Sequence, residues 1–303
     1  MINDEPSQAP PSVLYHYTSL EGLIGILTSG TLRATLITQL NDRLELGPGL
    51  RALTKVLEEH KAHRVLEELR DKDDDRVFVS CFCTSPSMIP MWSTYAAAAG
   101  GGYAIGIRTE KLTDATVLGV ADRRPALRRV SYDHSVAAAN IDRLASAMVV
   151  EEESDDPQFA EGWSANEILD QAAALKSPPW SHEDEWRLVI THHTFCGYDR
   201  EQSLRCRPSL HGPVPYLEVK MWSPPTSEDD WTYGGAEKGS HVDDWLESVW
   251  IGPTDGQLER ATGLEVLLRQ AGAAPHRARM PYRSPDRGQG EESLIHFSPL
   301  AMR

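Results

Sequence analysis

Short β-prone runs, rich in β-branched and aromatic residues, recur along the chain without a helix between each successive pair. The clearest runs cover residues 13–17, 77–83, 103–107, 214–221 and 246–251. A doubly wound parallel sheet needs a crossover helix after each strand, and the second half of this chain lacks that alternation. The pattern therefore predicts an α+β fold with a mixed, largely antiparallel sheet core flanked by helices.

Length and composition are those of a globular protein. The chain has 303 residues, of which 40% are hydrophobic and 25% charged, so a sizeable core can be buried. We expect a single α+β domain over residues 12–284, with a polar loop insertion at 223–242. The acidic, Pro-rich residues 1–11 are expected to be disordered. Residues 285–303 form the expected C-terminal tail, and the chain after Pro275 leaves room for one more strand.

Charge and targeting signals limit the partners. The formal net charge is −15, a poor basis for non-specific DNA or RNA binding through Lys and Arg. No apolar run is long enough to cross a bilayer, and the first residues lack the basic and apolar regions of a signal peptide. We therefore expect a cytoplasmic protein with no membrane partner. The four cysteines lack zinc-type spacing and are expected to be reduced thiols.

Polar-tipped residues stand at the end of the first predicted strand. The sequence YHYT closes this strand, and Thr18 with Glu21 matches a capping box at the start of a helix. Gly30 is the expected helix stop. His16 and Tyr17 then lie beside the positive end of the helix, where an anion is tolerated. The alternative is a histidine and aromatic rings packed at a strand edge.

A second segment joins a strand to a short aromatic helix. Residues 77–83 predict the strand, and Pro90 suits the first helical position. Trp92 and Tyr95 are three residues apart, so they share one face of the helix. They are candidates for stacking on a ligand ring, and the alternative is two core aromatics on a buried face.

A third segment carries two carboxylates. Residues 180–191 predict one strand, in which Glu183, Glu185 and Arg187 share the face opposite to Trp186. If this polar face lines a cleft, it can hold an ionised carboxylate against a developing positive charge. The alternative is a solvent-exposed edge with ordinary Glu–Arg pairing.

These three segments together resemble the DUF2971 family, a group of mostly bacterial proteins of unknown function. They are LYHYTSLEGLIGILTSGTL at residues 14–32, SCFCTSPSMIPMWSTYA at 80–96 and WSHEDEWRLVI at 180–190, followed by IGP at 251–253. The resemblance extends over residues 14–283. It implies little chemistry, because the family is defined without an activity.

The first segment is also similar to the first motif of ADP-ribosyltransferase-like folds, which include the DNA-modifying DarT toxins and the RNA 2′-phosphotransferases. In that superfamily a His or Arg at the end of the first core strand holds an NAD ribose. A Glu on a later strand assists cleavage of the glycosidic bond. The resemblance implies an ADP-ribosyltransferase-like fold with His16, Tyr95 and Glu185 as catalytic residues, and leaves Glu183 as the alternative carboxylate.

The same resemblance implies that NAD is the substrate. The residues expected to contact it are His16, Tyr17, Thr18, Ser80, Trp92, Tyr95, Glu183 and Arg187. Glu185 stabilises oxocarbenium-like charge on the ribose, and Arg187 or the helix N-terminus after Thr18 holds the pyrophosphate. Ser80, Thr84 and Ser85 only approximate the Ser-Thr-Ser element that packs around nicotinamide in the superfamily.

The leading functional prediction is an NAD-dependent ADP-ribosyltransferase of unknown acceptor, or an NAD glycohydrolase, with no metal required. The acceptor is a protein, a nucleic acid, water or a small molecule, and toxin or defence roles are common in the superfamily. The alternative is a non-catalytic module that binds a nucleotide or a partner on the same fold. A metal-dependent hydrolase using His182, His192 and His193 ranks last.

Overall fold

The chain forms two compact units, each assembled from separate stretches of sequence. Unit 1 comprises residues 1–32, 82–115 and 220–303, and unit 2 comprises residues 33–81 and 116–219. This computed structural model describes residues 9–40, 54–55, 58–59, 77–95, 102–118, 125–133, 139, 169–191, 203–209, 212–222, 241–254, 256–274 and 293–298. The expected single domain over residues 12–284 stays a prediction.

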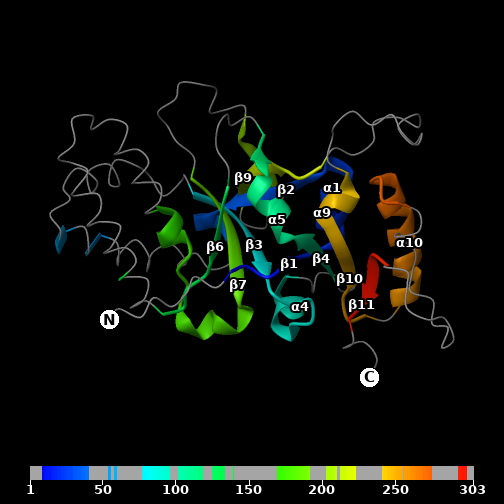
Figure 1. Ribbon diagram of the computed structural model, residues 1–303, viewed down its shortest axis with the longest axis horizontal. Helices are drawn as coiled ribbons and strands as arrows, with labels where there is room; N and C mark the ends of the chain where they lie inside the picture. The colour runs from blue at the N-terminus through cyan, green and yellow to red at the C-terminus, as the bar shows by residue number, and fades with distance from the viewer. Residues whose placement is uncertain are drawn as a thin grey trace. The chain divides into compact units, whose positions relative to one another are not determined.

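Unit 1 is built on strands in the order β11–β10–β4–β1 (Figure 1). They are β1 (Val13–Thr18), β4 (Tyr103–Arg108), β10 (Leu246–Ile251) and β11 (Ile295–Phe297). β1 and β10 run antiparallel to β4, and β11 runs parallel to β10. Leu14, Ile105 and Val249 share one face of these strands and are fully buried, so part of the core of unit 1 lies on that face. β11 confirms the extra strand expected after Pro275.

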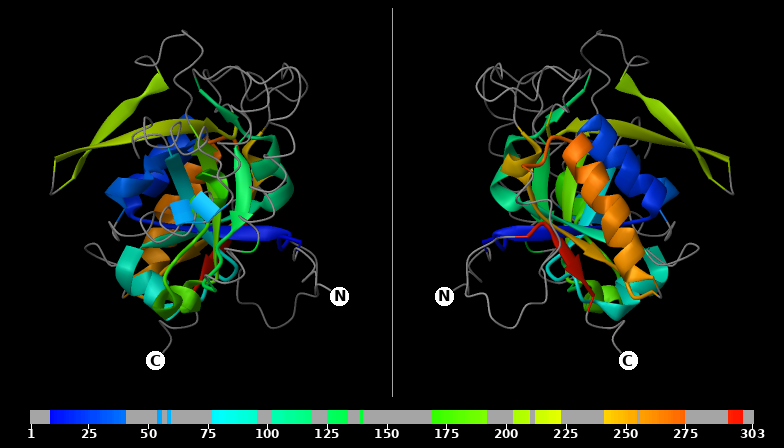
Figure 2. Two further views of the ribbon diagram at one scale, coloured as in Figure 1. Left: turned by 90° about the vertical axis from the view of Figure 1, so that its left-hand side faces the viewer. Right: turned by 90° about the vertical axis from the view of Figure 1, so that its right-hand side faces the viewer.

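The helices of unit 1 include α1, whose ends test the predicted caps. They are α1 (Leu20–Ser29), α4 (Ile89–Tyr95), α5 (Thr109–Asp114), α9 (Val242–Trp245) and α10 (Gln257–Gln270). The predicted Thr18 cap is wrong by one residue: Thr18 ends β1, and the Ser19 hydroxyl accepts a hydrogen bond from the Gly22 N–H at 3.2 Å. Gly30 ends α1 as predicted, with a left-handed φ of 65°. α1 packs beside α10 (Figure 2).

Unit 2 is also strand-rich. It contains β5 (Thr116–Val117), β6 (Ala126–Arg129), β7 (Glu185–Thr191), β8 (Arg205–Ser209) and the 3₁₀ helices η1 (Ile37–Gln39) and η2 (Pro178–Glu183). Most of β2 (Thr31–Leu36), β3 (Val77–Cys83) and β9 (Gly212–Lys220) also belong to it. β7 pairs with β3 and, in antiparallel register, with β6, while β8 and β9 form an antiparallel hairpin. Every residue of β7 is buried, so both of its faces are covered.

The predicted strand over residues 180–191 begins only at Glu185. Pro178 and Pro179 open η2 instead, because the fixed φ of proline suits the first turn of a helix. Asp184 then takes a left-handed φ of 40°, the only positive φ outside glycine in the described residues, and the chain enters β7. Glu183 therefore lies on η2, and the exposed-edge alternative is wrong because β7 is buried.

The predicted fold class agrees with this architecture. A largely antiparallel sheet flanked by helices is confirmed, and the ADP-ribosyltransferase-like assignment stays a prediction. Residues 1–8 and 223–240 lie outside the described residues, so the disordered N-terminus and the loop insertion are not described there. None of the helices in the described ranges has the length and apolarity needed to span a membrane.

Candidate functional site

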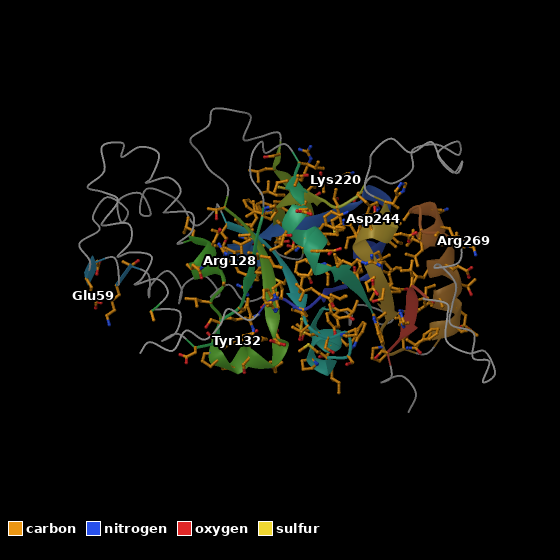
Figure 3. The ribbon with its side chains drawn as sticks, in the orientation of Figure 1. Glu59, Arg128, Tyr132, Lys220, Asp244 and Arg269 are labelled. Atoms are coloured by element: carbon orange, nitrogen blue, oxygen red, sulfur yellow. The ribbon has the colours of Figure 1, made fainter. Side chains whose placement is uncertain are left out.

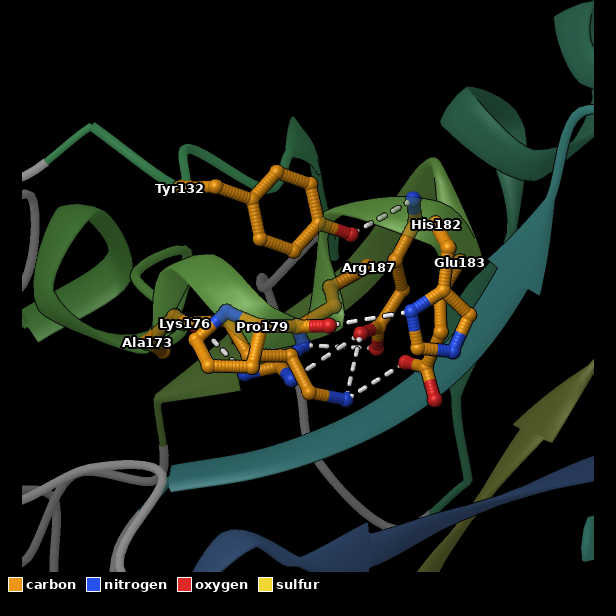
Figure 4. Close-up of polar contacts among 8 residues, drawn as sticks. Tyr132, Ala173, Lys176, Pro179, His182, Glu183 and Arg187 are labelled. Atoms are coloured by element: carbon orange, nitrogen blue, oxygen red, sulfur yellow. Dashed lines mark hydrogen bonds and ion pairs between the residues drawn. The ribbon is translucent and has the colours of Figure 1, made fainter.

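Four charged side chains form a buried ion cluster in unit 2, shown in Figure 4. The cluster consists of Lys176, Glu183, Glu185 and Arg187, and each residue is at most 2% exposed. Lys176 Nζ lies 2.6 Å from Glu183 Oε2 and 3.1 Å from Glu185 Oε2. Two cations therefore face two carboxylates, and the charges of the cluster balance. Charged side chains are rarely buried to this degree unless they are paired.

Arg187 fixes the Glu185 carboxylate in a defined plane. Its Nε donates to Glu185 Oε1 at 2.8 Å and its Nη2 donates to Glu185 Oε2 at 3.2 Å. Its Nη1 donates to the carbonyl oxygen of Ala173 at 2.7 Å. The two residues are neighbours on one face of β7, so the strand period itself brings them together. A paired contact of this kind fixes orientation as well as charge.

Neighbouring elements complete the surroundings of Glu185. The Glu185 N–H donates to the hydroxyl oxygen of Tyr132, a residue labelled in Figure 3, at 3.0 Å. The Cys81 thiol on β3 also donates to the Glu185 carboxylate. The Trp180 ring on η2 covers the ammonium group of Lys176, with Nζ 5.1 Å from the ring centroid. Four separate stretches of chain therefore surround one carboxylate.

The ion cluster keeps Glu185 ionised. Burial raises the pKa of the Glu185 carboxyl, but the charge and hydrogen bonds of Arg187, followed by the charge of Lys176, outweigh burial. The resulting pKa of Glu185 is about 2, against an ordinary value of 4.5. Burial raises the pKa of Tyr132, so its hydroxyl stays protonated beside the cluster.

The predicted residues of unit 1 lie in a different environment. Tyr17 is 7% exposed, and its hydroxyl donates to the Ser85 carbonyl oxygen at 2.8 Å and accepts from the Met88 N–H at 3.1 Å. Its ring meets the edge of Trp92, with the centroids 4.8 Å apart. Trp92 is 5% exposed within the same apolar cluster. For Tyr17 and Trp92 the core-packing alternative matches these contacts.

The remaining predicted residues have varied surroundings. His16 is partly exposed on β1, and its ring lies 5.7 Å from that of Phe82. Thr18 is the last residue of β1. Ser80 is buried in unit 2, where its hydroxyl donates to the Arg33 carbonyl oxygen at 3.0 Å. Tyr95 ends α4, and its side chain lies outside the described residues.

These placements divide the predicted site between the two units. Unit 2 brings Glu183, Glu185 and Arg187 together in the ion cluster. Unit 1 holds His16, Tyr17, Thr18, Trp92 and Tyr95. The convergence of His16, Tyr95 and Glu185 on one cavity stays a prediction.

The sequence pattern missed Lys176, Tyr132 and Cys81. Lys176 follows a run of alanine and leucine and precedes Pro178, so it reads as the polar end of a helix. A spacing of seven residues to Glu183 crosses a turn and two prolines, and no helix or strand period predicts that contact. The sequence also gives no spacing that predicts the contacts of Tyr132 and Cys81. Both reach Glu185 from elements that are distant along the chain.

A metal centre gains no support from the described residues. Among them, no group of three His, Cys, Asp or Glu side chains has a geometry that suits a metal ion. His182 is exposed on η2, with Nδ1 3.0 Å from the Pro179 carbonyl oxygen. His192 and His193 lie outside the described residues.

Comparison with protein-family models gives a match over part of the chain. A family model described as "Protein of unknown function (DUF2971)" matches residues 91–188. This range includes the whole ion cluster and excludes the first segment at residues 14–32. No curated protein and no solved structure gives a significant match. Over residues 91–188, the chain is therefore similar to a family without an assigned activity.

Proposed function

We propose that the protein is an NAD-dependent ADP-ribosyltransferase or NAD glycohydrolase in which Glu185 stabilises the transition state. The observation that carries this proposal is the Glu185 carboxylate itself, which is buried, held by Arg187 and ionised at neutral pH. A fixed negative charge in a buried, preorganised site is the group that an oxocarbenium-like ribose requires. The similarity of the first segment to NAD-using folds supplies the substrate.

The proposed reaction transfers one group and needs no redox partner. The bond between ribose C1′ and the nicotinamide nitrogen breaks, and its electron pair leaves with neutral nicotinamide. Positive charge then develops on the ribose, where the Glu185 carboxylate accepts a hydrogen bond from the 2′-hydroxyl. An acceptor oxygen or nitrogen, or water, forms the new bond to C1′ and releases its proton to solvent.

The hydrogen bonds that Glu185 already accepts determine how a substrate hydroxyl can bind to it. Arg187 and Lys176 together supply three hydrogen bonds to the carboxylate, and the Cys81 thiol supplies another. A carboxylate offers about four acceptor positions. A ribose hydroxyl that reaches Glu185 would therefore replace one of these donors.

His16 needs a test of its own. His16 lies in unit 1, where its ring is 5.7 Å from that of Phe82, whereas Glu185 lies in unit 2. If His16 holds a ribose hydroxyl in the same reaction, His16→Ala raises KM for NAD and lowers kcat.

Incubation with NAD labelled on the nicotinamide or the adenylate half tests the proposal. We expect nicotinamide release, together with labelled acceptor when cell lysate is present. Glu185→Gln should lower kcat about 10²–10³-fold, as removal of one transition-state contact does. Glu185→Asp keeps the charge and serves if the Gln variant does not fold. Glu247→Gln, at a partly exposed glutamate of unit 1, is the matched control and should keep full activity. Absence of both products with the wild-type protein contradicts the proposal.

A second candidate function is a non-catalytic nucleotide- or partner-binding module. The observation that favours it is the balance of the ion cluster, which satisfies Glu185 without any substrate. In that case the cluster only stabilises unit 2. Calorimetry then shows NAD or ADP-ribose binding that Glu185→Gln leaves unchanged, with no nicotinamide released.

A further inference from the structure

One ammonium group joins the two carboxylates of the ion cluster (Figure 4). Lys176 Nζ donates to Glu183 at 2.6 Å and to Glu185 at 3.1 Å, and all three side chains are only 2–3% exposed. We propose that Lys176 is a positioning residue for the Glu185 carboxylate, and that Glu183 acts by holding Lys176 rather than by touching substrate. This inference rests on the proposed function, because Glu185 is the group that is positioned.

The two cations hold Glu185 in different ways. Arg187 is fixed at three points, by both oxygens of Glu185 and by the Ala173 carbonyl oxygen. Its planar guanidinium is rigid, whereas the ammonium of Lys176 is a point charge on a flexible stem. Arg187 therefore sets the plane of the carboxylate, and Lys176 is the cation that can move.

The two hydrogen bonds of Lys176 differ in length, and this difference determines which of them a ribose hydroxyl can replace. The shorter contact, to Glu183, anchors the ammonium, and the Trp180 ring covers it from η2. The longer contact, to Glu185, is the one that a ribose hydroxyl can replace while Glu183 retains the ammonium nearby. Lys176 then keeps its charge beside Glu185 without occupying the acceptor position.

Several charged and titratable groups of the described residues lie around Glu185. Arg187 faces it from β7, Lys176 from the chain before η2, and Glu183 from η2. The Tyr132 hydroxyl and the Cys81 thiol approach from beside β6 and from β3. Lys176 is the cation that can be removed with its own counter-charge, Glu183, while the Glu185–Arg187 pair stays intact.

A set of variants separates positioning from stability. Lys176→Met removes the ammonium and leaves one carboxylate charge in excess. Lys176→Met combined with Glu183→Gln restores neutrality and keeps the Glu185–Arg187 pair. Lys176→Arg keeps the charge. Arg129→Met is the matched control, because Arg129 pairs with Asp184 beside the cluster in a contact whose side chains are 48% and 43% exposed.

The pH dependence of kcat/KM for NAD is the decisive measurement. Loss of Lys176 should move the acid limb of the profile upward by about one pH unit or more, since an opposite charge at this distance lowers a carboxyl pKa by about 1–3 units. We expect this shift in Lys176→Met and a smaller shift of the same sign in the neutral double variant, because the like charge of Glu183 is also removed there. Lys176→Arg and Arg129→Met should not shift the limb. A neutral double variant with the wild-type profile overturns the proposal. So does a Lys176→Arg variant whose limb shifts as far as that of Lys176→Met.

Carboxyl ¹³C NMR tests the role of Lys176 without requiring enzyme turnover. Glutamate labelled at the side-chain carboxyl is titrated in the wild-type and neutral double variants, with the Glu185 signal assigned from its loss in Glu185→Gln. We expect Glu185 to titrate at higher pH in the double variant. An unchanged titration overturns the role of Lys176. If the titration shifts while wild-type protein releases no nicotinamide, the proposed function fails and the positioning of Glu185 by Lys176 stands.

Discussion

The buried polar groups of the two units have different kinds of partners. In unit 1 the aromatic cluster around Tyr17 and Trp92 is apolar, and the single Tyr17 hydroxyl is satisfied by main-chain atoms. In unit 2 the ion cluster buries four full charges that pair with one another. Apolar packing stabilises at any pH, whereas a buried ion cluster is stable only while every partner keeps its charge.

This difference suggests different roles. A folded protein gains little from burying ion pairs, and apolar residues of similar volume often replace them at no cost. Packing accounts for the aromatic cluster, apart from the Trp92 Nε1–H, which is buried without a hydrogen-bond partner among the described residues. The ion cluster holds a carboxylate at a pKa of about 2, and such perturbed groups collect at functional sites.

Arg187→Met should be among the most destabilising substitutions in unit 2. It leaves two buried carboxylates facing one ammonium and removes the donor to the Ala173 carbonyl oxygen. Breaking a buried ion pair costs about 3–5 kcal/mol. Urea unfolding at neutral pH measures the loss. Arg187→Met combined with Glu185→Leu removes the whole pair and should recover most of the stability. A double variant that recovers no stability would show that the ion cluster itself contributes to the stability of the fold.

Trp92→Ala should cost a similar amount in unit 1 for a different reason. It removes a large ring that packs on Tyr17 and Met91 and opens a cavity between β1 and α4. Large aromatic truncations in a core cost about 3–5 kcal/mol. Unfolding measured at pH 4 and pH 7 should give the same loss, because no group in this cluster titrates between those values. A pH-dependent loss would contradict the contrast between the units.

The sequence predicted several regular elements correctly, among them β3 and the end of α1. Residues 77–83 follow the strand pattern, and β3 has those bounds. Gly30 ends α1 because only a residue without a Cβ takes the left-handed conformation cheaply. The cap at Ser19 was missed by one position, since Thr18 and Ser19 both carry suitable hydroxyls and the end of β1 decides between them.

The ion cluster was beyond prediction from periodicity. A strand pattern assigns Glu183 and Glu185 to one face, but Asp184 turns the chain and puts Glu183 on η2. The partner of both carboxylates, Lys176, lies across Pro178 and Pro179, where no regular spacing applies. Burial of β7 excludes the solvent-exposed edge, one of the two settings that the alternating Glu, Glu, Arg pattern left open.

Acid should weaken unit 2 before unit 1. The folded-state pKa of Glu185 is about 2 and its ordinary value is 4.5, so the unfolded chain binds the proton first. The stabilising effect of the ionised carboxylate is complete above pH 4.5 and disappears as the pH falls through 2. Its size is on the order of 3 kcal/mol. Hydrogen exchange at pH 3 and pH 6, corrected for intrinsic rates, should show protection lost in β7 before β1. Equal loss in both strands would contradict the prediction.

The smallest expected effects come from two exposed ion pairs, one in each unit. Arg108 pairs with Glu247 at 2.9 Å in unit 1, and Arg129 pairs with Asp184 at 3.3 Å in unit 2. The side chains in these pairs are 33–48% exposed, so solvent and salt screen the interaction. Arg108→Met and Arg129→Met should each cost about 0–1 kcal/mol, and less in 1 M salt. Urea unfolding at low and high salt measures both. If Arg129→Met cost as much as Arg187→Met, location in unit 2 rather than burial would set the strength of the ion pairs in that unit. The contrast between the buried ion cluster of unit 2 and the aromatic cluster of unit 1 would then lose its physical basis.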